Sequence, residues 1–354
     1  MTSGKAGGGV SGVGGGVAGG RAGGAAAGAV FSRLLHLGDV VIDVVLDIPA
    51  LPERGGDVLA SRTELTPGGG FNVLAAAARL GLRASYAGLH GTGPLADLAR
   101  AGLAAEGIEV LQPPKPGQDT GFVVSMVDAA GERTFVTSPG VEATLTGADL
   151  ARVVAGPADA VYLSGYSLVY SANRDALLGW LARLDGGTVV FFDPGPLLRS
   201  ISPDALATVL QRADWVTLNS REAALLAGQQ DAAGAGAAAA LRTLTERPSW
   251  TARPGQGVLV RTGAKGCMLA HFETPLRVVP GFPVAVVDSN GAGDTHTGAF
   301  IAALAAGEDA AAAARLANAA AALSVTRHGP ATAPTTAELG RFLSGQSWNS
   351  SFRN

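Results

Sequence analysis

The chain has 354 residues, 47% of them hydrophobic and 16% charged, which is enough to bury a large core in one α/β domain or in a main domain with a smaller attachment. Its formal net charge of −3 gives no reason to expect binding to nucleic acid or to a membrane surface. A single cysteine, Cys267, excludes an internal disulfide and a cysteine-rich metal site, so we expect a reducing, cytoplasmic location.

The two ends of the chain differ from its centre. Residues 1–30 are mostly Gly and Ala, and the glycines argue against a signal peptide, which needs a compact apolar stretch. Gly-rich chain cannot offset its ordering entropy, so we predict a disordered tail there. The folded domain is expected over 31–345, followed by a C-terminal tail over 346–354.

Strand and helix signals alternate along the domain. A first strand is predicted over 34–48, which is rich in β-branched residues, and prolines and glycines then break the chain. An Ala-rich helix over 71–80 ends at Gly81. This alternation is typical of a mostly parallel sheet covered by helices. The later strands are expected at 84–89, 160–163, 188–192, 215–218 and 257–261, with helices between them and three helices after Gly291.

Two segments do not fit this alternation. Short strand-like pieces at about 47–66 and a hairpin at about 119–138 interrupt the strand and helix order. They are candidates for a small separate sheet that acts as a lid, or for simple edge strands of the main sheet.

A glycine-rich segment follows an apolar, β-like run at 282–287 and precedes a long Ala-rich helix; it reads Asp288-Ser289-Asn290-Gly291-Ala292-Gly293-Asp294-Thr295. Its glycines allow a sharp turn and leave amides free at a helix N-terminus, where they favour an anion. Asp294 could be a helix-capping acid. Alternatively, its carboxylate lies beside an anion hole. That arrangement suits phosphoryl transfer, because the amides hold the phosphoryl oxygens while the carboxylate accepts a hydroxyl proton.

This segment resembles the C-terminal signature of the PfkB, or ribokinase-like, carbohydrate kinases, Asp-Thr-x-Gly-Ala-Gly-Asp-x-Phe-x-Gly. Ser289 replaces Thr, and His296 replaces Phe, which marks a subfamily of bacterial sugar kinases. The resemblance runs from about residue 34 to 345. It implies a three-layer α/β/α fold with a mostly parallel central sheet and a small β-sheet lid. The signature residues in place are Asp288, Gly291, Ala292, Gly293, Asp294 and Gly298.

The resemblance also assigns a sugar site. Asp43 matches the Asp that ends the family's first strand and binds substrate hydroxyls. Gly68, Gly69 and Asn72 match the family's Gly-Gly-x-x-x-Asn signature, in which the glycines let the sugar approach the backbone and the Asn contacts its hydroxyls. Taken alone, Asn72 could instead be a first-turn helix cap.

The nucleotide and metal residues are likewise implied by resemblance. Asn219 and Glu222 match the family's Asn-x-x-Glu motif, which organises Mg²⁺ through water near the ATP phosphates, and hard oxygen donors suit that ion. The same pair could be a helix capping box. Gly263, Gly266 and Asn318 match positions near the nucleotide, although the two glycines could be ordinary hairpin residues. A K⁺ loop is implied at Asp288, Asn290, Ser324, Arg327 and Gly329, mostly through backbone carbonyls.

Two other nucleotide-binding classes are excluded. None of the three lysines lies in the Walker frame Gly-x-x-x-x-Gly-Lys-Ser/Thr, and the first predicted strand is not followed by Gly-x-Gly-x-x-Gly. We therefore predict an ATP-dependent kinase that phosphorylates a hydroxyl of a small sugar, with Asp294 as general base and a homodimer formed through the lid. A nucleoside kinase and a non-catalytic sugar- or nucleotide-binding regulator of the same fold are the alternatives.

Overall fold

The computed structural model describes residue 1 and residues 31–228, 241, 256–271 and 276–345. The predicted tails lie outside the described residues, apart from Met1. Among the described residues, one sheet of nine strands forms the centre of the molecule, in the order β13-β12-β11-β10-β9-β8-β1-β4-β5. Its strands are β1 (Arg33–His36), β4 (Arg83–Tyr86), β5 (Glu109–Val110), β8 (Asp159–Ser164), β9 (Val189–Asp193), β10 (Trp215–Asn219), β11 (Gly257–Arg261), β12 (Gly266–His271) and β13 (Arg277–Pro280).

The strands from β5 to β11 run parallel, whereas β12 and β13 add an antiparallel edge. Runs such as Val189-Val190-Phe191-Phe192 are apolar at every position, which is typical of strands covered on both faces. Leu34 packs into one buried cluster and its neighbour Leu35 into the other. The predicted mostly parallel sheet with helices on both sides is therefore confirmed.

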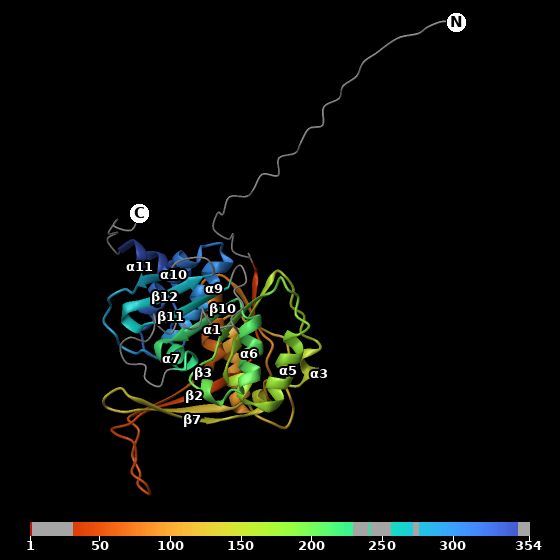
Figure 1. Ribbon diagram of the computed structural model, residues 1–354. Coiled ribbons are helices and arrows are strands. Elements are labelled where there is room, and N and C mark those ends of the chain that lie inside the picture. The colour runs from red at the N-terminus through yellow and green to blue at the C-terminus, as the bar shows by residue number, and fades with distance from the viewer. Residues whose placement is uncertain (2–30, 229–240, 242–255, 272–275, 346–354) are drawn as a thin grey trace.

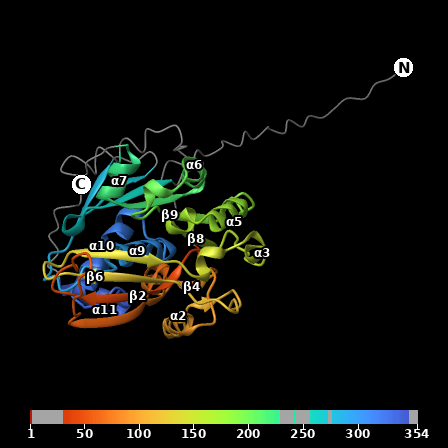
Figure 2. The same cartoon turned by 90° about the horizontal axis from the view of Figure 1, so that it is seen from below.

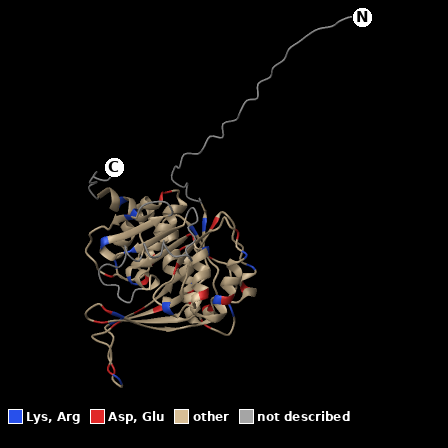
Figure 3. Cartoon of the chain, in the orientation of Figure 1, with Lys and Arg blue, Asp and Glu red and all other residues tan. Residues whose placement is uncertain are grey.

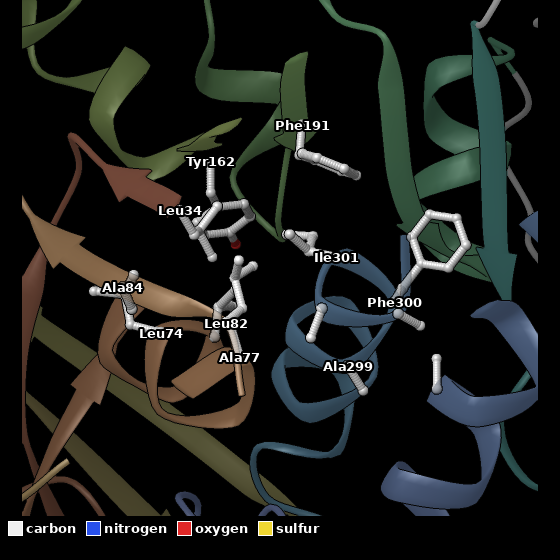
Figure 4. Close-up of a cluster of buried hydrophobic side chains, with 14 of the residues drawn as sticks. Leu34, Leu74, Ala77, Leu82, Ala84, Tyr162, Phe191, Ala299, Phe300 and Ile301 are labelled. Carbon is white, nitrogen blue, oxygen red and sulfur yellow. The ribbon is translucent and has the colours of Figure 1, made fainter. Parts of the chain in front are cut away.

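Helices cover both faces and make three layers (Figures 1 and 2). One face carries α1 (Gly70–Arg79), α2 (Pro94–Ala105), α9 (Ala292–Ala305), α10 (Ala310–Ser324) and α11 (Thr336–Gly345). The other face carries α3 (Gly147–Leu150), α5 (Ser171–Leu181), α6 (Pro203–Arg212) and α7 (Ser220–Leu226), with the short α4 (Tyr166–Val169) after β8. Figure 4 shows Phe300 and Ile301 of α9 among the buried side chains that face Tyr162 and Phe191 of the sheet.

A second sheet has four strands in the order β3-β2-β6-β7, namely β2 (Val40–Asp47), β3 (Arg62–Gly69), β6 (Phe122–Val127) and β7 (Arg133–Ser138). It lies at one end of the layered body, and the segment 48–61 projects away from it (Figure 1). The small separate sheet is confirmed, although it begins earlier than the predicted 47.

Two predicted strands differ from the structure. The strand predicted over 34–48 is two strands in different sheets, because the chain turns at Gly38, where an added Cβ would lie 2.5 Å from Cε1 of His36. Asp43 therefore lies within the small sheet, not at the end of the first strand. The run 282–287 is not a strand, and Val286 and Val287 at its end are exposed.

Charges of both signs are interspersed over the fold (Figure 3). Of the helices that the structure describes, none has the length and apolar character needed to cross a membrane.

Candidate active site

The carboxyl ends of the parallel strands and the start of α9 meet at one edge of the large sheet. Asp193 ends β9, Asn219 ends β10 and Arg261 ends β11. Nη2 of Arg261 donates to Oδ2 of Asp193 at 3.0 Å, and its Nη1 donates to Thr297 of α9 at 2.8 Å. Polar side chains at this edge of an open α/β sheet are typical of a ligand site.

The turn into α9 depends on Gly291. This residue has a φ of 68°, in the left-handed region, and a Cβ added to it would lie 1.9 Å from the carbonyl oxygen of Pro330. The turn leaves the first N–H groups of α9 without intrahelical partners, as at any helix start, and the helix dipole adds positive potential there. Asp294 lies in that first turn, so a carboxylate and an anion-binding helix end are side by side.

Asp294 is joined to the substrate segment predicted from sequence. Nδ2 of Asn72, in the first turn of α1, donates to Oδ2 of Asp294 at 3.0 Å, across 222 residues of chain. Burial raises the pKa of Asp294 to about 6, and the charges of Asp193 and Asp39 add to this, while Asn72 and Arg261 oppose it. Asn72 is thus a partner of the proposed base and not the cap of its own helix, since α1 has no side-chain cap.

Asp43 faces the glycines of β3. A Cβ added to Gly68 would lie 2.3 Å from Oδ2 of Asp43, so a larger residue there would displace this carboxylate. Gly69 has a φ of 64°, and its added Cβ would lie 3.0 Å from Oδ2 of Asp39. Burial raises the pKa of Asp43 to about 7, with further increases from Asp294 and Asp39. Asp294 and Asp39 are therefore close enough to Asp43 to affect its ionisation.

Asp39 was missed in the sequence analysis. It precedes β2, four residues before Asp43, and burial raises its pKa against the opposing effect of His36. Oδ1 of Asp39 and Oδ1 of Asn72 are buried and have no hydrogen-bond partner among the described residues. Buried acceptors without partners are costly, which indicates that this part of the site is built to receive donor groups.

Asn219 and Glu222 form the capping box that was the alternative to a metal role. The N–H of Glu222 donates to Oδ1 of Asn219, and the N–H of Asn219 donates to Oε2 of Glu222, each at 2.8 Å. The carboxylates of Glu222 and Asp193 nevertheless both face Arg261, at 3.8 and 3.0 Å. Burial raises the pKa of Glu222 to about 7, the charge of Asp193 adds to this, and Arg261 opposes it.

This donor set fits a hydrated divalent cation. The carboxylates of Asp193 and Glu222 are hard oxygen donors, and excess buried negative charge beside an anion-binding helix end suits an ion that bridges to phosphate oxygens. Within the described part of the chain, no three or more His, Cys, Asp and Glu side chains gather to hold a metal by themselves. The sequence had not indicated Asp193, although a polar residue that ends a buried strand was a usable signal.

His296 and Asn318 are a buried pair between α9 and α10. Nε2 of His296 lies 3.0 Å from Oδ1 of Asn318, whose Nδ2 donates to the carbonyl oxygens of Val279 and Pro280 at 3.0 and 3.1 Å. Burial lowers the pKa of His296 to about 3, so the neutral ring donates through Nε2. The unusual His296 thus fixes Asn318 against the end of β13. Contact of Asn318 with adenine stays a prediction.

Gly263 lies in the turn between β11 and β12, and Gly266 is the first residue of β12. Both have positive φ, 64° and 99°, and a Cβ on Gly266 would lie 2.2 Å from the carbonyl oxygen of Val279. The turn itself requires these glycines, so their role at a nucleotide also stays a prediction.

The sequence and the fold can be compared with known proteins. Residues 32–337 match the pfkB family carbohydrate kinases. The "Uncharacterized sugar kinase YegV" of Escherichia coli is 35% identical, covering 87% of this chain and 93% of that protein. The ATP-dependent ribose-1-phosphate kinase of Halopiger xanaduensis is 32% identical, covering 88% and 98%. A fructokinase double mutant from Vibrio cholerae O395, solved with fructose, ADP and a potassium ion, has a TM-score of 0.70 and 26% identity, covering 89% and 99%.

These matches cover nearly the whole described fold, and they include proteins named as sugar and sugar-phosphate kinases. The chain is a kinase of the phosphotransferase class, and it belongs to the PfkB family of carbohydrate kinases.

Proposed function

We propose that the protein transfers the γ-phosphoryl group of ATP to a hydroxyl of a small uncharged sugar, with Asp294 as the general base. The contact that carries this proposal is the hydrogen bond from Asn72 to Asp294 at the N-terminus of α9. It joins the predicted sugar segment to a carboxylate whose pKa is raised to about 6. Such a group is mostly ionised at neutral pH and still basic enough to accept a proton.

The proposed reaction is one in-line displacement. A sugar hydroxyl oxygen bonds to the γ-phosphorus, Asp294 takes the hydroxyl proton, and the bond from the γ-phosphorus to the bridging oxygen breaks, leaving ADP. The amides at Gly291, Ala292 and Gly293 stabilise the negative charge on the transferring group. The use of ATP and the lone Cys267, which is buried and unpaired, agree with a cytoplasmic enzyme.

Glu222 and Asn219, with Asp193 beside them, are the residues that we assign to Mg²⁺ through its water molecules. When bound, the ion would offset charge on the ATP phosphates. Arg261 lies between the two carboxylates and keeps them from repelling each other. Its contact with Thr297 also ties this cluster to α9.

The character of the sugar site favours a neutral, donor-rich substrate. Asp43, Asp39 and Asn72 offer acceptor atoms, which match hydroxyl groups and would repel a phosphate. A phosphosugar needs converging cations, but Arg62 pairs with acids of its own sheet and Arg133 pairs with Asp288. We therefore favour a free sugar over a sugar phosphate.

A nucleoside is the second candidate, because Tyr166 offers an aromatic ring near the carboxylates. Burial raises the pKa of Tyr166, and the charges of Asp39, Asp294 and Asp43 raise it further, which supports a place for this ring beside the carboxylates. An aromatic face is what a nucleoside base requires.

A panel of free sugars, sugar phosphates and nucleosides, assayed for ADP release with MgATP, tests the proposal. The Asp294→Asn variant gives the background for each compound. The proposal predicts turnover above that background with at least one free sugar. Turnover only with a nucleoside selects the second candidate, and equal rates for both proteins with every compound would refute the base.

The small sheet is also a candidate dimer interface. Leu65, Phe135 and Val136 on its strands are exposed, at 48%, 56% and 55%. Exposed apolar residues on a small sheet suit coverage by a second copy. We propose a homodimer through this sheet. Sedimentation of the wild type and of Phe135→Asp tests it, and a wild type that is monomeric at micromolar concentration would contradict it.

A further inference from the structure

The carboxylate of Asp288 links three parts of the chain around the loop that precedes α9, in addition to the backbone hydrogen bonds from Val287 and Asp288 to Val325. Its Oδ1 accepts the N–H of Asn290 at 2.8 Å, and its Oδ2 accepts the N–H of Gly329 at 3.1 Å. A third donor is the guanidinium of Arg133, which reaches Asp288 from β7 of the small sheet. Both side chains are largely shielded from solvent, with 21% of Arg133 and 16% of Asp288 exposed.

These contacts lower the pKa of Asp288. Burial alone would raise it, but the N–H groups of Asn290 and Gly329 and the charge of Arg133 together outweigh burial. The carboxylate is therefore ionised at neutral pH, and its counter-charge is already present within the protein.

The K⁺ set implied by resemblance does not fit this arrangement. The carbonyl oxygens of Ser324 and Gly329 both face the hydroxyl of Thr332, at 3.1 and 3.3 Å. The carboxylate expected to attract the ion already carries a guanidinium, and a second cation beside Asp288 would be repelled by it.

We propose that Arg133 supplies, from the small sheet, the fixed positive charge that holds Asp288 and the loop 288–291, so that this kinase needs no monovalent cation. The proposal rests on the kinase activity proposed above. Arg133 is a positioning residue, because it acts through Asp288 on the amides at Gly291 and Gly293 and does not itself reach the reacting atoms.

The arrangement has a structural consequence. Arg133 belongs to the four-stranded sheet, whereas Asp288 belongs to the loop before α9, so one ion pair joins the small sheet to the anion-binding turn. The position of that sheet and the geometry of the turn are therefore coupled.

The first measurement is turnover in equal concentrations of KCl, NaCl and tetramethylammonium chloride. The wild type should be equally active in all three. Arg133→Met should lose activity in tetramethylammonium, on the order of tenfold, and recover part of it in KCl, whereas Arg133→Lys should keep most of its activity in all three salts. Arg174→Met is the matched control, since Arg174 pairs with Asp175 on α5, and it should show no response to the cation.

Thermal unfolding in the same salts gives a second result that does not depend on turnover. KCl should raise the Tm of Arg133→Met above its value in tetramethylammonium chloride and leave the Tm of the wild type unchanged between the two. The comparison of Tm values tests the role of Arg133 even if no substrate is found. Failure of this proposal and failure of the proposed function can therefore be distinguished.

Three results would overturn the proposal. They are activation or stabilisation of the wild type by K⁺ over tetramethylammonium, full activity of Arg133→Met without K⁺, and a folded Arg133→Met that K⁺ does not restore. If Arg133→Met does not fold, the cation dependence of the wild type and of Arg133→Lys tests the proposal. Independence of K⁺ in both supports the proposal, and activation of either by K⁺ overturns it.

Discussion

Replacing Asp294 with Asn should make the protein more stable while removing its activity. The structure buries this carboxylate near Asp193 and Asp39, and its pKa rises from the ordinary 3.8 to about 6. An acid whose pKa is raised by folding destabilises the folded state once it is ionised. The Asn variant keeps the size of the side chain and one acceptor oxygen for Asn72, but it cannot ionise.

The size of this effect follows from the pKa difference. A shift of about two units corresponds to about 3 kcal/mol at most, and partial solvent access reduces this, so we expect a gain of about 1–3 kcal/mol at pH 7.5. Between pH 3.8 and about 6 the folded state holds a proton that the unfolded state has released. Wild-type stability therefore falls as pH rises through this window, and the full cost is present above it.

Urea unfolding of both proteins at pH 7.5 and near pH 4 measures the effect. The advantage of the Asn variant should be present at pH 7.5 and largely lost near pH 4. Asp97→Asn is the control, because the Asp97 side chain is 70% exposed, and it should change stability by less than about 0.5 kcal/mol. An Asp294→Asn protein that is less stable at pH 7.5, or whose difference from the wild type does not vary with pH, would refute the buried-charge account.

Three further substitutions test other parts of the site. Asn72→Ala removes the hydrogen-bond donor that lowers the pKa of Asp294. The acidic limb of the pH profile of kcat/KM should therefore move to higher pH by about one to two units. A limb at the same pH would contradict the assignment of Asp294 as the base that Asn72 stabilises. Gly291→Ala places a Cβ 1.9 Å from the carbonyl oxygen of Pro330 at a φ of 68°. Turnover should therefore be lost, and urea unfolding should show a destabilisation of about 1–3 kcal/mol or more. Gly340→Ala, where a Cβ meets open space, is the control, and equal effects of the two substitutions would contradict the structural role of Gly291 in the turn. Arg261→Met leaves two neighbouring carboxylates without their cation, so Mg²⁺ should raise its Tm more than that of the wild type, and an equal response would argue against a metal there.

Much of the fold could be predicted from local sequence patterns. The strand predicted over 188–192 and the Ala-rich helix predicted over 71–80 lie close to their observed bounds, because buried parallel strands and helices have distinct patterns. The split at Gly38 was missed, since apolar and β-branched residues flank Gly38 and Asp39 on both sides and the break depends on the close approach of the chain to His36. The run 282–287 was misjudged because apolar composition alone does not supply a neighbouring strand.

Some residues of the site could be predicted from sequence motifs, and others could not. Asp294, Asn72 and Asp43 could be proposed from motifs, and the structure brings them together from distant segments. Asp39 and Asp193 could not, because their importance depends on burial and on partners far away in the chain. A substitution such as His296 becomes intelligible only with Asn318, 22 residues later, which it binds.

The pairing of Arg133 with Asp288 could not be predicted from the motifs. The residues expected to hold K⁺ are present in the sequence. In the structure, the guanidinium of Arg133 from the small sheet pairs with the carboxylate of Asp288, which belongs to that set. The sequence around either residue does not predict this ion pair, since 155 positions separate Arg133 from Asp288.

The central claim is that Asp294 accepts the proton of the substrate hydroxyl. The most direct measurement is kcat of the wild type and of Asp294→Asn with the same sugar, with the Kd of MgATP measured separately by calorimetry. The account predicts that kcat falls by about 10²- to 10⁴-fold while the Kd for MgATP is little changed. An Asn variant with a kcat within a few-fold of the wild type would contradict it.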